Sequence, residues 1–240
     1  ISGLAVNVTT NLCFYKFNQI DTNTKKDRRH FVDNVLTSID FVTIERNDTK
    51  YRIPLNPRGN VGLWGRGELG CFGPNHAADP VVLRRRPGSD RMTEIVLIKR
   101  SDSHMWALPG GMVEAGSDMS NTCVNEFAEE AMDSNNMKDV DVAIVKQDIR
   151  DKFKAASAEY PPVYKGQVFD DPRNTNCAWM ETTVQVFYDK DDTLGFQNWN
   201  LKAGDDAIGV RWFSVNDLPK NLYANHMQYI NMALNQVMEK

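Results

Sequence analysis

The sequence predicts an α/β fold, namely an α/β/α sandwich around a mixed sheet, with a smaller N-terminal lobe. Two kinds of segment predict it. Short apolar runs bounded by turn residues are typical of strands. Longer segments between them repeat apolar residues every three to four positions, as helices that pack on a sheet do. We expect residues 1–88 to form the N-terminal lobe with an ordered loop region, and residues 89–240 to form the core.

The N-terminal part of the chain carries few strong signals. Residues 1–50 contain short mixed segments, including a polar stretch at 21–29 and an expected strand at 41–45. Residues 51–80 are rich in Gly, Pro and Asn, the residues that dominate turns. This composition predicts an ordered loop region rather than a linker.

The remaining elements follow in order along the core. Strands are expected at 81–86, 95–100, 140–145, 178–188 and 210–215, and helices at 118–132, 147–158 and 223–239. The segment Pro-Gly-Ser-Asp at 87–90 forms the turn between the first two of these strands. Strands interspersed with helices in this way fit the three-layer sandwich.

The most informative segment is a glycine-rich turn at 106–116 that leads directly into the helix at 118–132. This helix contains neither Pro nor Gly, and Ser117 stands at the position of an N-cap. An apolar stripe that can pack on a sheet recurs every four residues, at Met119, Cys123, Phe127 and Ala131.

Three carboxylates, those of Glu126, Glu129 and Glu130, can reach one side of this helix. Like charges at that spacing repel, and a hard cation reverses the sign of the effect. Mg²⁺ prefers oxygen ligands and commonly bridges one or two carboxylates to a substrate phosphate. The alternative is a solvated acidic face, the usual fate of a Glu-rich turn. The preceding glycine turn favours the metal–phosphate interpretation.

Composition limits the class of protein. With 25% charged and 41% hydrophobic residues, the chain is not disordered, and no apolar run reaches membrane-spanning length. The net charge of −4 argues against general binding of nucleic acids.

Because the chain begins at Ile1, we expect a fragment of a longer protein. The widely spaced cysteines predict reduced thiols in a cytosolic compartment; they are Cys13, Cys71, Cys123 and Cys177.

The segment 111–133 resembles the Nudix box, which reads Gly, five residues, Glu, seven residues, then Arg-Glu-apolar-x-Glu-Glu-x-Gly-apolar. The matching positions are Gly111, Glu126, Phe127, Glu129 and Glu130. Ser117 replaces the first Glu, Asn125 replaces the Arg, and Met132-Asp133 replace the closing pair. The resemblance implies that the metal ligands are retained, whereas the salt bridges that brace the loop and helix are lost.

Further motifs extend the resemblance to the ADP-ribose pyrophosphatases and to the homologous ADP-ribose-sensing domain of melastatin-type transient receptor potential cation channels. They lie at 55–59, 62–67, 73–80, 164–166, 170–175, 178–182 and 203–207. Cys-Phe-Gly-Pro-Asn-His at 71–76 and Leu-Tyr-Ala-Asn-His at 222–226 are closer to the channel domain. The resemblance covers the chain from about residue 51 to its end.

The resemblance implies roles for individual residues. Mg²⁺, with Mn²⁺ as a substitute, is expected on Glu126 and Glu130, assisted by Glu129 and the Gly111 carbonyl. Asp205 or Asp206 would orient the attacking water as a general base, or would only cap the next element. The expected substrate-binding residues are His76, Asp171, Arg173, Tyr223 and Asn225.

Each of these substrate residues also has a purely structural interpretation. Arg173 suits bidentate contact with a phosphate or ribose oxygen, but equally a salt bridge to Asp170 or Asp171. His76 would contact the diphosphate or a base, or would satisfy backbone groups. Tyr223 is expected near the adenosine half of the ligand, or in the core with its hydroxyl at the rim.

We therefore expect a Nudix fold that binds ADP-ribose and hydrolyses it to AMP and ribose 5-phosphate. The favoured context is the cytosolic C-terminal domain of an ADP-ribose-gated channel, with a part in calcium signalling and the rest of a tetrameric channel as partner. No nucleic acid and no membrane contact are expected for the fragment itself. The alternatives are a sensor with impaired turnover, a stand-alone cytoplasmic pyrophosphatase, and an interface domain of a tetramer.

Overall fold

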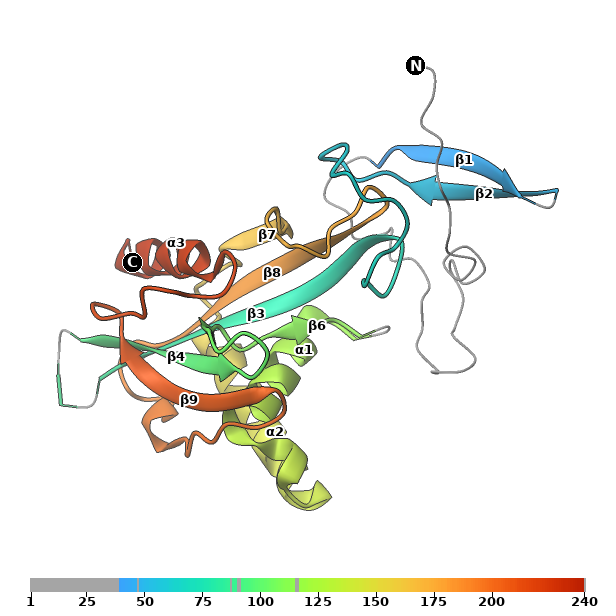
Figure 1. Cartoon of the computed structure of the whole chain (residues 1–240). Helices are drawn as coiled ribbons and strands as arrows, with labels where there is room; N and C mark the ends of the chain where they lie inside the picture. The colour runs from blue at the N-terminus through green and yellow to red at the C-terminus, as the bar shows by residue number, and fades with distance from the viewer. Residues whose placement is uncertain (1–38, 47, 87, 90–91, 115–116, 240) are drawn as a thin grey trace. The chain divides into compact units, whose positions relative to one another are not determined.

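The computed structural model describes residues 39–46, 48–86, 88–89, 92–114 and 117–239 (Figure 1). The polar stretch expected at 21–29 and Cys13 lie outside these residues. The elements are β1 (Phe41–Arg46), β2 (Thr49–Pro54), β3 (Gly73–Arg85), β4 (Thr93–Arg100), β5 (Trp106–Ala107), β6 (Gly111–Met112), α1 (Met119–Glu126), the π-helical turn η2 (Phe127–Ala131), the 3₁₀ turn η3 (Ser134–Asn136), α2 (Asp139–Ala156), β7 (Tyr164–Gln167), β8 (Ala178–Asp189), the 3₁₀ turn η4 (Phe196–Asn198), β9 (Ala207–Ser214) and α3 (His226–Met238).

The chain divides into two compact units. The first contains the described part of residues 1–75 together with 171–180, and the second contains residues 76–170 and 181–240. Both β3 and β8 therefore begin in the first unit and continue in the second. The sequence suggests a division after residue 88, which lies shortly after the end of β3. The first unit ends earlier, at residue 75, within β3.

The first unit is built on a hairpin and an ordered loop. β1 and β2 pair antiparallel, which confirms the strand expected at 41–45. The loop prediction for 51–80 is wrong at both ends, because β2 extends to Pro54 and β3 starts at Gly73. Between them the loop is ordered by hydrogen bonds to Asn176, whose side chain accepts from Val61 N–H (2.6 Å) and donates to Asn60 Oδ1 (2.8 Å).

The second unit contains most of a seven-stranded sheet. Its strands follow the order β5-β4-β3-β8-β7, and β6 pairs with β3 while β9 pairs with β4. The register places Leu83 opposite Ile95 and Ile98 opposite Ala107. The strands expected at 81–86, 95–100, 178–188 and 210–215 are confirmed as parts of β3, β4, β8 and β9.

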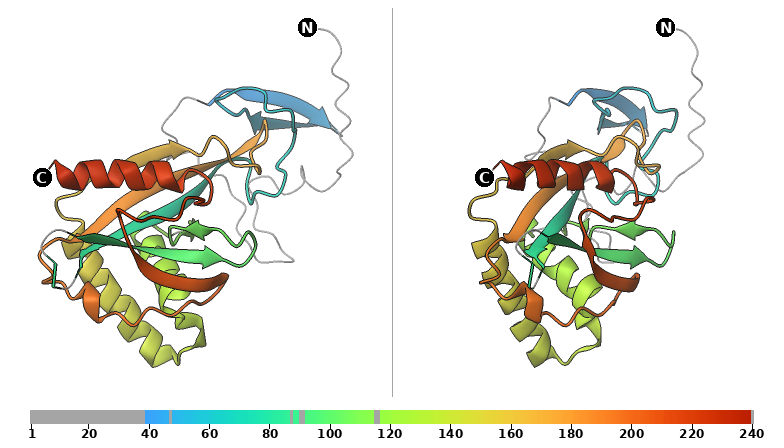
Figure 2. Two further views of the ribbon diagram at one scale, coloured as in Figure 1. Left: turned by 60° about the vertical axis from the view of Figure 1, so that its left-hand side comes forward. Right: turned by 90° about the vertical axis from the view of Figure 1, so that its left-hand side faces the viewer.

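Alternate residues of the central strands enter two different cores. Val82, Val96 and Ile98 pack in a cluster with residues of α1, η2 and α2. Val81 and Leu97, which point the opposite way, pack in a second cluster with residues of α3. Figure 1 and Figure 2 show α3 on one side of the sheet and α1 and α2 on the other. The predicted α/β/α sandwich is confirmed.

One expected strand is a helix. Residues 140–145 lie in α2, which runs from Asp139 to Ala156 and also contains most of the helix expected at 147–158. The run Val-Asp-Val-Ala-Ile-Val is rich in β-branched residues, and apolar and polar residues partly alternate in it. This is why the sequence predicts a strand there. Two acidic residues in the first turn favour a helix start there. Burial of Ile149 and Phe153 then attaches α2 to the sheet.

Two expectations from composition can be compared with the described residues. Cys71, Cys123 and Cys177 are buried free thiols, as expected for reduced cysteines. Across the described ranges, no helix combines the length and the apolar character needed to cross a membrane.

Candidate functional site

The glycine turn between β5 and β6 requires two of its glycines. A Cβ atom on Gly110 would lie 2.5 Å from Asp79 Oδ1 and 2.7 Å from the Ala78 carbonyl oxygen. A Cβ atom on Gly111 would lie 2.5 Å from the carboxylate of Glu126. The first glycine therefore lets the backbone pass close to β3, and the second leaves room for a carboxylate.

The turn is also attached to the C-terminal part of the chain. Leu108 N–H donates to Nδ1 of His226, the first residue of α3, over 2.8 Å. Tyr223 N–H donates to the Trp106 carbonyl over 2.8 Å. Burial lowers the pKa of His226, so the ring stays neutral at physiological pH and its Nδ1 remains an acceptor.

The helix after the turn begins and ends differently from a plain α-helix. The carboxylate of Asp118 accepts from Asn121 N–H (2.7 Å), so Asp118 is the N-cap and the prediction for Ser117 is wrong. The backbone of Asp118 is extended, as an N-cap requires, and its side chain is long enough to reach back to that N–H. From Phe127 to Ala131 the helix widens into the π-helical turn, a feature frequent at functional sites.

Glu126 and Glu130 face the glycine turn. Glu130 is 3% exposed, and one of its carboxylate oxygens accepts from Gly110 N–H over 2.8 Å. Burial, followed by the adjacent Asp206 carboxylate, raises the pKa of Glu130 to about 9. Burial, followed by the charge of Glu129, raises the pKa of Glu126 to about 7. Both shifts come from unfavourable burial of negative charge, which a divalent cation would offset.

The side chain of Glu129 contacts α2 and not the glycine turn. Its carboxylate forms an ion pair with Lys146 of α2, with 2.8 Å between Nζ and Oε1. This contact joins the π-helical turn to α2. Of the three glutamates, Glu126 and Glu130 are thus the two that the glycine turn contacts directly.

The loop before β9 is fixed to the end of this helix. Lys202 N–H donates to the Ala131 carbonyl (2.9 Å), and Gly204 N–H donates to the Glu130 carbonyl (3.2 Å). These bonds satisfy carbonyl groups that a helix C-terminus otherwise leaves without partners. They also hold the two residues after Gly204, the Asp pair expected to include a general base, beside the glutamates.

Both members of that Asp pair lie close to the glutamates. Asp205 has a left-handed backbone, with φ 51°. The charges of Asp205 and Asp206 contribute, after burial and Glu129, to the raised pKa of Glu126. Asp206 lies 3.5 Å from Nη2 of Arg100, a residue for which the sequence suggests no role.

The residues at the turn suit a hard divalent cation. The donors are carboxylates and backbone carbonyls, and Gly111 leaves space beside Glu126 that any Cβ atom would fill. Among the residues that the structure describes, no three Asp, Glu, His or Cys side chains are grouped closely enough to hold a metal ion alone. Water and phosphate oxygens would therefore complete the ligands, as Mg²⁺ sites commonly require.

Three of the expected substrate residues lie in the second unit. His76 Nδ1 is 3.8 Å from the carboxylate of Glu181, and the His76 carbonyl accepts from Val113 N–H (2.8 Å). The backbone of His76 therefore has a structural role in addition to any role of its ring. The Tyr223 ring packs against the guanidinium of Arg100, and Asn225 directly precedes α3.

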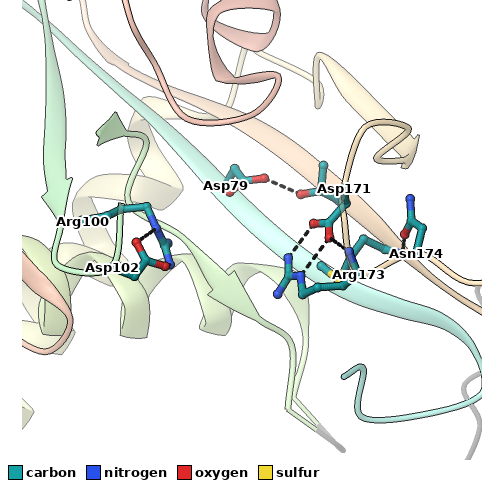
Figure 3. A network of polar contacts seen from close by, with 8 residues as sticks. Asp79, Arg100, Asp102, Asp171, Arg173 and Asn174 are labelled. Carbon is teal, nitrogen blue, oxygen red and sulfur yellow. Dashed lines mark hydrogen bonds and ion pairs between the residues drawn. The ribbon is translucent and has the colours of Figure 1, made fainter. Parts of the chain in front are cut away.

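The other two expected substrate residues, Asp171 and Arg173, pair with each other in the first unit. Figure 3 shows the guanidinium of Arg173 facing the Asp171 carboxylate, with Nε–Oδ1 of 2.9 Å and Nη2–Oδ2 of 2.6 Å. The structural interpretation of Arg173, a salt bridge to Asp171, is thus confirmed. Its use as a ligand contact stays a prediction.

Three further residues contact the site, and the sequence suggests no role for them: Arg100, Lys146 and His226. Lys146 and His226 act on the site through one contact each, to Glu129 and to Leu108 N–H. A strand-end arginine shortly before the glycine turn is the signal by which Arg100 could have been found.

The chain is similar to known proteins over most of its length. A sequence model of the NUDIX domain matches residues 74–232. A Caenorhabditis elegans protein assigned to the nudix hydrolases is 42% identical over 214 residues, which cover 89% of this chain and 75% of that protein. The mitochondrial ADP-ribose pyrophosphatase of Rattus norvegicus is 43% identical over 192 residues, covering 75% of this chain and 53% of the enzyme.

A channel is also similar. The transient receptor potential cation channel subfamily M member-like 2 of Nematostella vectensis is 43% identical over 187 residues, covering 74% of this chain and 12% of the channel. The chain thus spans about half the length of the rat enzyme and about an eighth of the channel.

Proposed function

The chain belongs to the Nudix family, and we propose on this premise that it hydrolyses ADP-ribose to AMP and ribose 5-phosphate. The observation that carries the proposal is a pair of carboxyl groups held at the Gly110–Gly111 turn, those of the half-buried Glu126 and the buried Glu130. Their raised pKa values indicate a place where negative charge is unfavourable until a cation joins it. The similarity to an ADP-ribose pyrophosphatase supports the substrate.

Glu126 and Glu130, with the Gly111 carbonyl, would hold Mg²⁺ or, as a substitute, Mn²⁺. When bound, the cation neutralises phosphate charge and makes a water molecule more acidic. Asp205 or Asp206 accepts the proton of the attacking water. Asp171 and Arg173 orient the diphosphate or the terminal ribose. His76 contacts the diphosphate or a base. Tyr223 and Asn225 contact the adenosine half.

A second candidate function, an ADP-ribose sensor with impaired turnover, is favoured by Ser117 and Asn125. These residues remove the ion pair that braces the turn and helix in the Nudix box, and small misalignments can lower a rate about 10²-fold. The contacts of the described residues support retained turnover. Lys146 holds Glu129, and Lys202 and Gly204 hold the carbonyls of the last helical turn.

The cellular context is proposed separately. The similarity to a channel supports a place as the cytosolic C-terminal domain of an ADP-ribose-gated cation channel, with the other channel subunits as partners and a role in calcium signalling. The similarity to a mitochondrial enzyme supports a stand-alone pyrophosphatase instead. The length of the natural full-length protein decides between these two.

The hydrolysis itself is tested by incubating the purified chain with ADP-ribose and Mg²⁺ and measuring AMP by chromatography. We expect AMP from the native sequence, none from Glu130→Gln, and native rates from Glu45→Gln, an exposed glutamate of the first unit. Binding of ADP-ribose is measured in parallel by calorimetry. Binding without AMP would favour the sensor, and turnover by Glu130→Gln would refute the metal assignment.

A further inference from the structure

Arg100 ends β4 at an irregularity of the sheet. β4 pairs with β9 in regular register from Glu94 to Lys99, and the register shifts between Lys99 and Arg100, which pairs with Ala207. Bulges of this kind re-aim a side chain and are frequent beside active sites. The irregularity therefore lies where β9 begins, directly after Asp206.

The guanidinium of Arg100 reaches two residues to which the proposed function gives a role. Its Nη2 is 3.5 Å from Asp206 Oδ2, and its central carbon lies 4.7 Å from the centroid of the Tyr223 ring. The backbone strengthens the first contact, because Ser101 N–H donates to the Asp206 carbonyl over 2.8 Å. One side chain thus links the candidate base with the candidate adenosine contact.

A third contact sets the plane of this guanidinium. Asp102 accepts from Nε (3.0 Å) and from Nη2 (2.8 Å) of Arg100, a forked pair that Figure 3 also shows. The Asp102 side chain is 57% exposed. An ion pair with an exposed carboxylate contributes little to the stability of a fold. The fork therefore orients Arg100 more than it stabilises the protein.

We propose that Arg100 is a positioning residue, which holds the Asp206 carboxylate and the Tyr223 ring in the arrangement that hydrolysis needs; this inference rests on the proposed function. Asp206 lies beside the carboxyl groups of Glu126 and Glu130, and its negative charge contributes to the raised pKa of both. The fixed cation of Arg100 attracts the Asp206 carboxylate and keeps it in place. Its flat face packs on Tyr223, as a planar guanidinium can and an ammonium cannot.

The chain offers a matched control in Arg84. Its Nε and Nη2 donate to one oxygen of Glu94 (3.0 and 2.8 Å), and its guanidinium carbon lies 3.9 Å from the Trp212 ring. The chemistry is that of Arg100, a forked ion pair on an aromatic ring, but Glu94 is near the opposite end of β4. Arg84→Gln therefore reports the purely structural effect of losing such an arginine.

The test compares ADP-ribose hydrolysis by Arg100→Gln, Arg100→Lys and Arg84→Gln, after thermal melts show that each is folded. We expect kcat of Arg100→Gln to fall about 10- to 100-fold, because Asp206 is no longer aligned. Arg100→Lys should recover kcat to within about 5-fold while KM stays raised, since its ammonium pairs with Asp206 but lacks the flat face for Tyr223. Arg84→Gln should leave kcat and KM within about 2-fold of native, because Arg84 contacts Glu94 and Trp212, to which the proposed function gives no role. Unchanged kcat in Arg100→Gln, or an equal loss in Arg84→Gln, would overturn the inference.

Amide hydrogen exchange separates this inference from the proposed function. The amides of Ala207 and Tyr223 are hydrogen-bonded to the carbonyls of Gly204 and Trp106, so both are expected to exchange slowly. We expect both to exchange faster in Arg100→Gln than in the native chain, and at native rates in Arg84→Gln. Absence of AMP from the native chain would count against the function alone, whereas unchanged exchange in Arg100→Gln would overturn the positioning role.

Discussion

Glu130 couples the charge of the site to the stability of the fold. Its pKa is raised from 4.5 to about 9, so between these values the folded protein keeps a proton that the unfolded chain has released. The free energy of unfolding of the metal-free protein should therefore decrease as the pH rises, by at most about 1.4 kcal/mol per pH unit. Glu130→Gln should show a weaker decrease, measured by thermal melts in EDTA from pH 6 to pH 9.

Mg²⁺ should reverse this trend if Glu130 is a ligand. A cation binds the deprotonated carboxylate, so the rise in Tm on adding Mg²⁺ should be larger at pH 8 than at pH 6. The same Mg²⁺-induced rise should be absent from Glu130→Gln and retained by Glu45→Gln. A pH-independent rise, equal in the three proteins, would place the cation elsewhere.

Single residues of the site differ in how far the sequence could predict them. The spacing of Glu126 and Glu130 and the glycines before them indicated a phosphate-linked cation site without any structure. The position of Arg100 at a strand end before the glycine turn is a signal in the sequence, but its partners Asp206 and Tyr223 could not be predicted. They are more than a hundred residues away along the chain. The pairing of β4 with β9 brings them together, and register of that kind is a tertiary property.

Among the elements, the helix of the site was predicted well and α2 was not. The stripe of Cys123, Phe127 and Ala131 is buried as expected, because helical spacing alone directs it to the sheet. In the first half of α2, by contrast, Val140 and Ile144 are exposed. The apolar residues there do not form a buried stripe at helical spacing, so the sequence does not indicate a helix. The π-helical turn could not be anticipated either, since two of its carbonyls accept hydrogen bonds from the loop before β9, which is far along the chain.

That loop gives a prediction at the scale of the element. A Cβ atom on Gly204 would lie 2.6 Å from both the Glu129 carbonyl oxygen and Asp133 Cα, which are backbone atoms that cannot move aside. Gly204→Ala should therefore lower the free energy of unfolding by about 1–3 kcal/mol and displace the Asp pair. Both the denaturant midpoint and the rate of AMP formation should fall.

Gly209, in β9, provides the comparison for this prediction. A Cβ atom there meets side-chain atoms only at 3.5 and 3.8 Å, which is ordinary contact. Gly209→Ala should therefore change the free energy of unfolding by less than about 0.5 kcal/mol and leave turnover intact. Equal losses in the two variants would mean that the π-helical turn does not depend on close packing at Gly204.

At the scale of the molecule, the candidate site residues belong to both compact units. Asp171 and Arg173 are in the first, and the glutamates, the Asp pair, His76, Tyr223 and Asn225 are in the second. Segment order and composition indicated the sandwich but not this division. The division depends on residues 171–180, which lie far along the sequence from the loop at 55–72 that they contact.

The placement of β3 decides where the chain can be shortened. Val81, Val82 and Leu83 are fully buried and supply both cores of the second unit. Burial of each such side chain contributes about 1.5–3 kcal/mol, and the net stability of a domain is only about 5–15 kcal/mol. A fragment of residues 89–240, cut at the division suggested by the sequence, should therefore lack a cooperative thermal melt.

A fragment of residues 73–240 keeps β3 and should melt cooperatively, as followed by near-ultraviolet circular dichroism. Cooperative melting of the shorter fragment would show that β3 is dispensable, whereas failure of both would show that the second unit needs the first in order to fold.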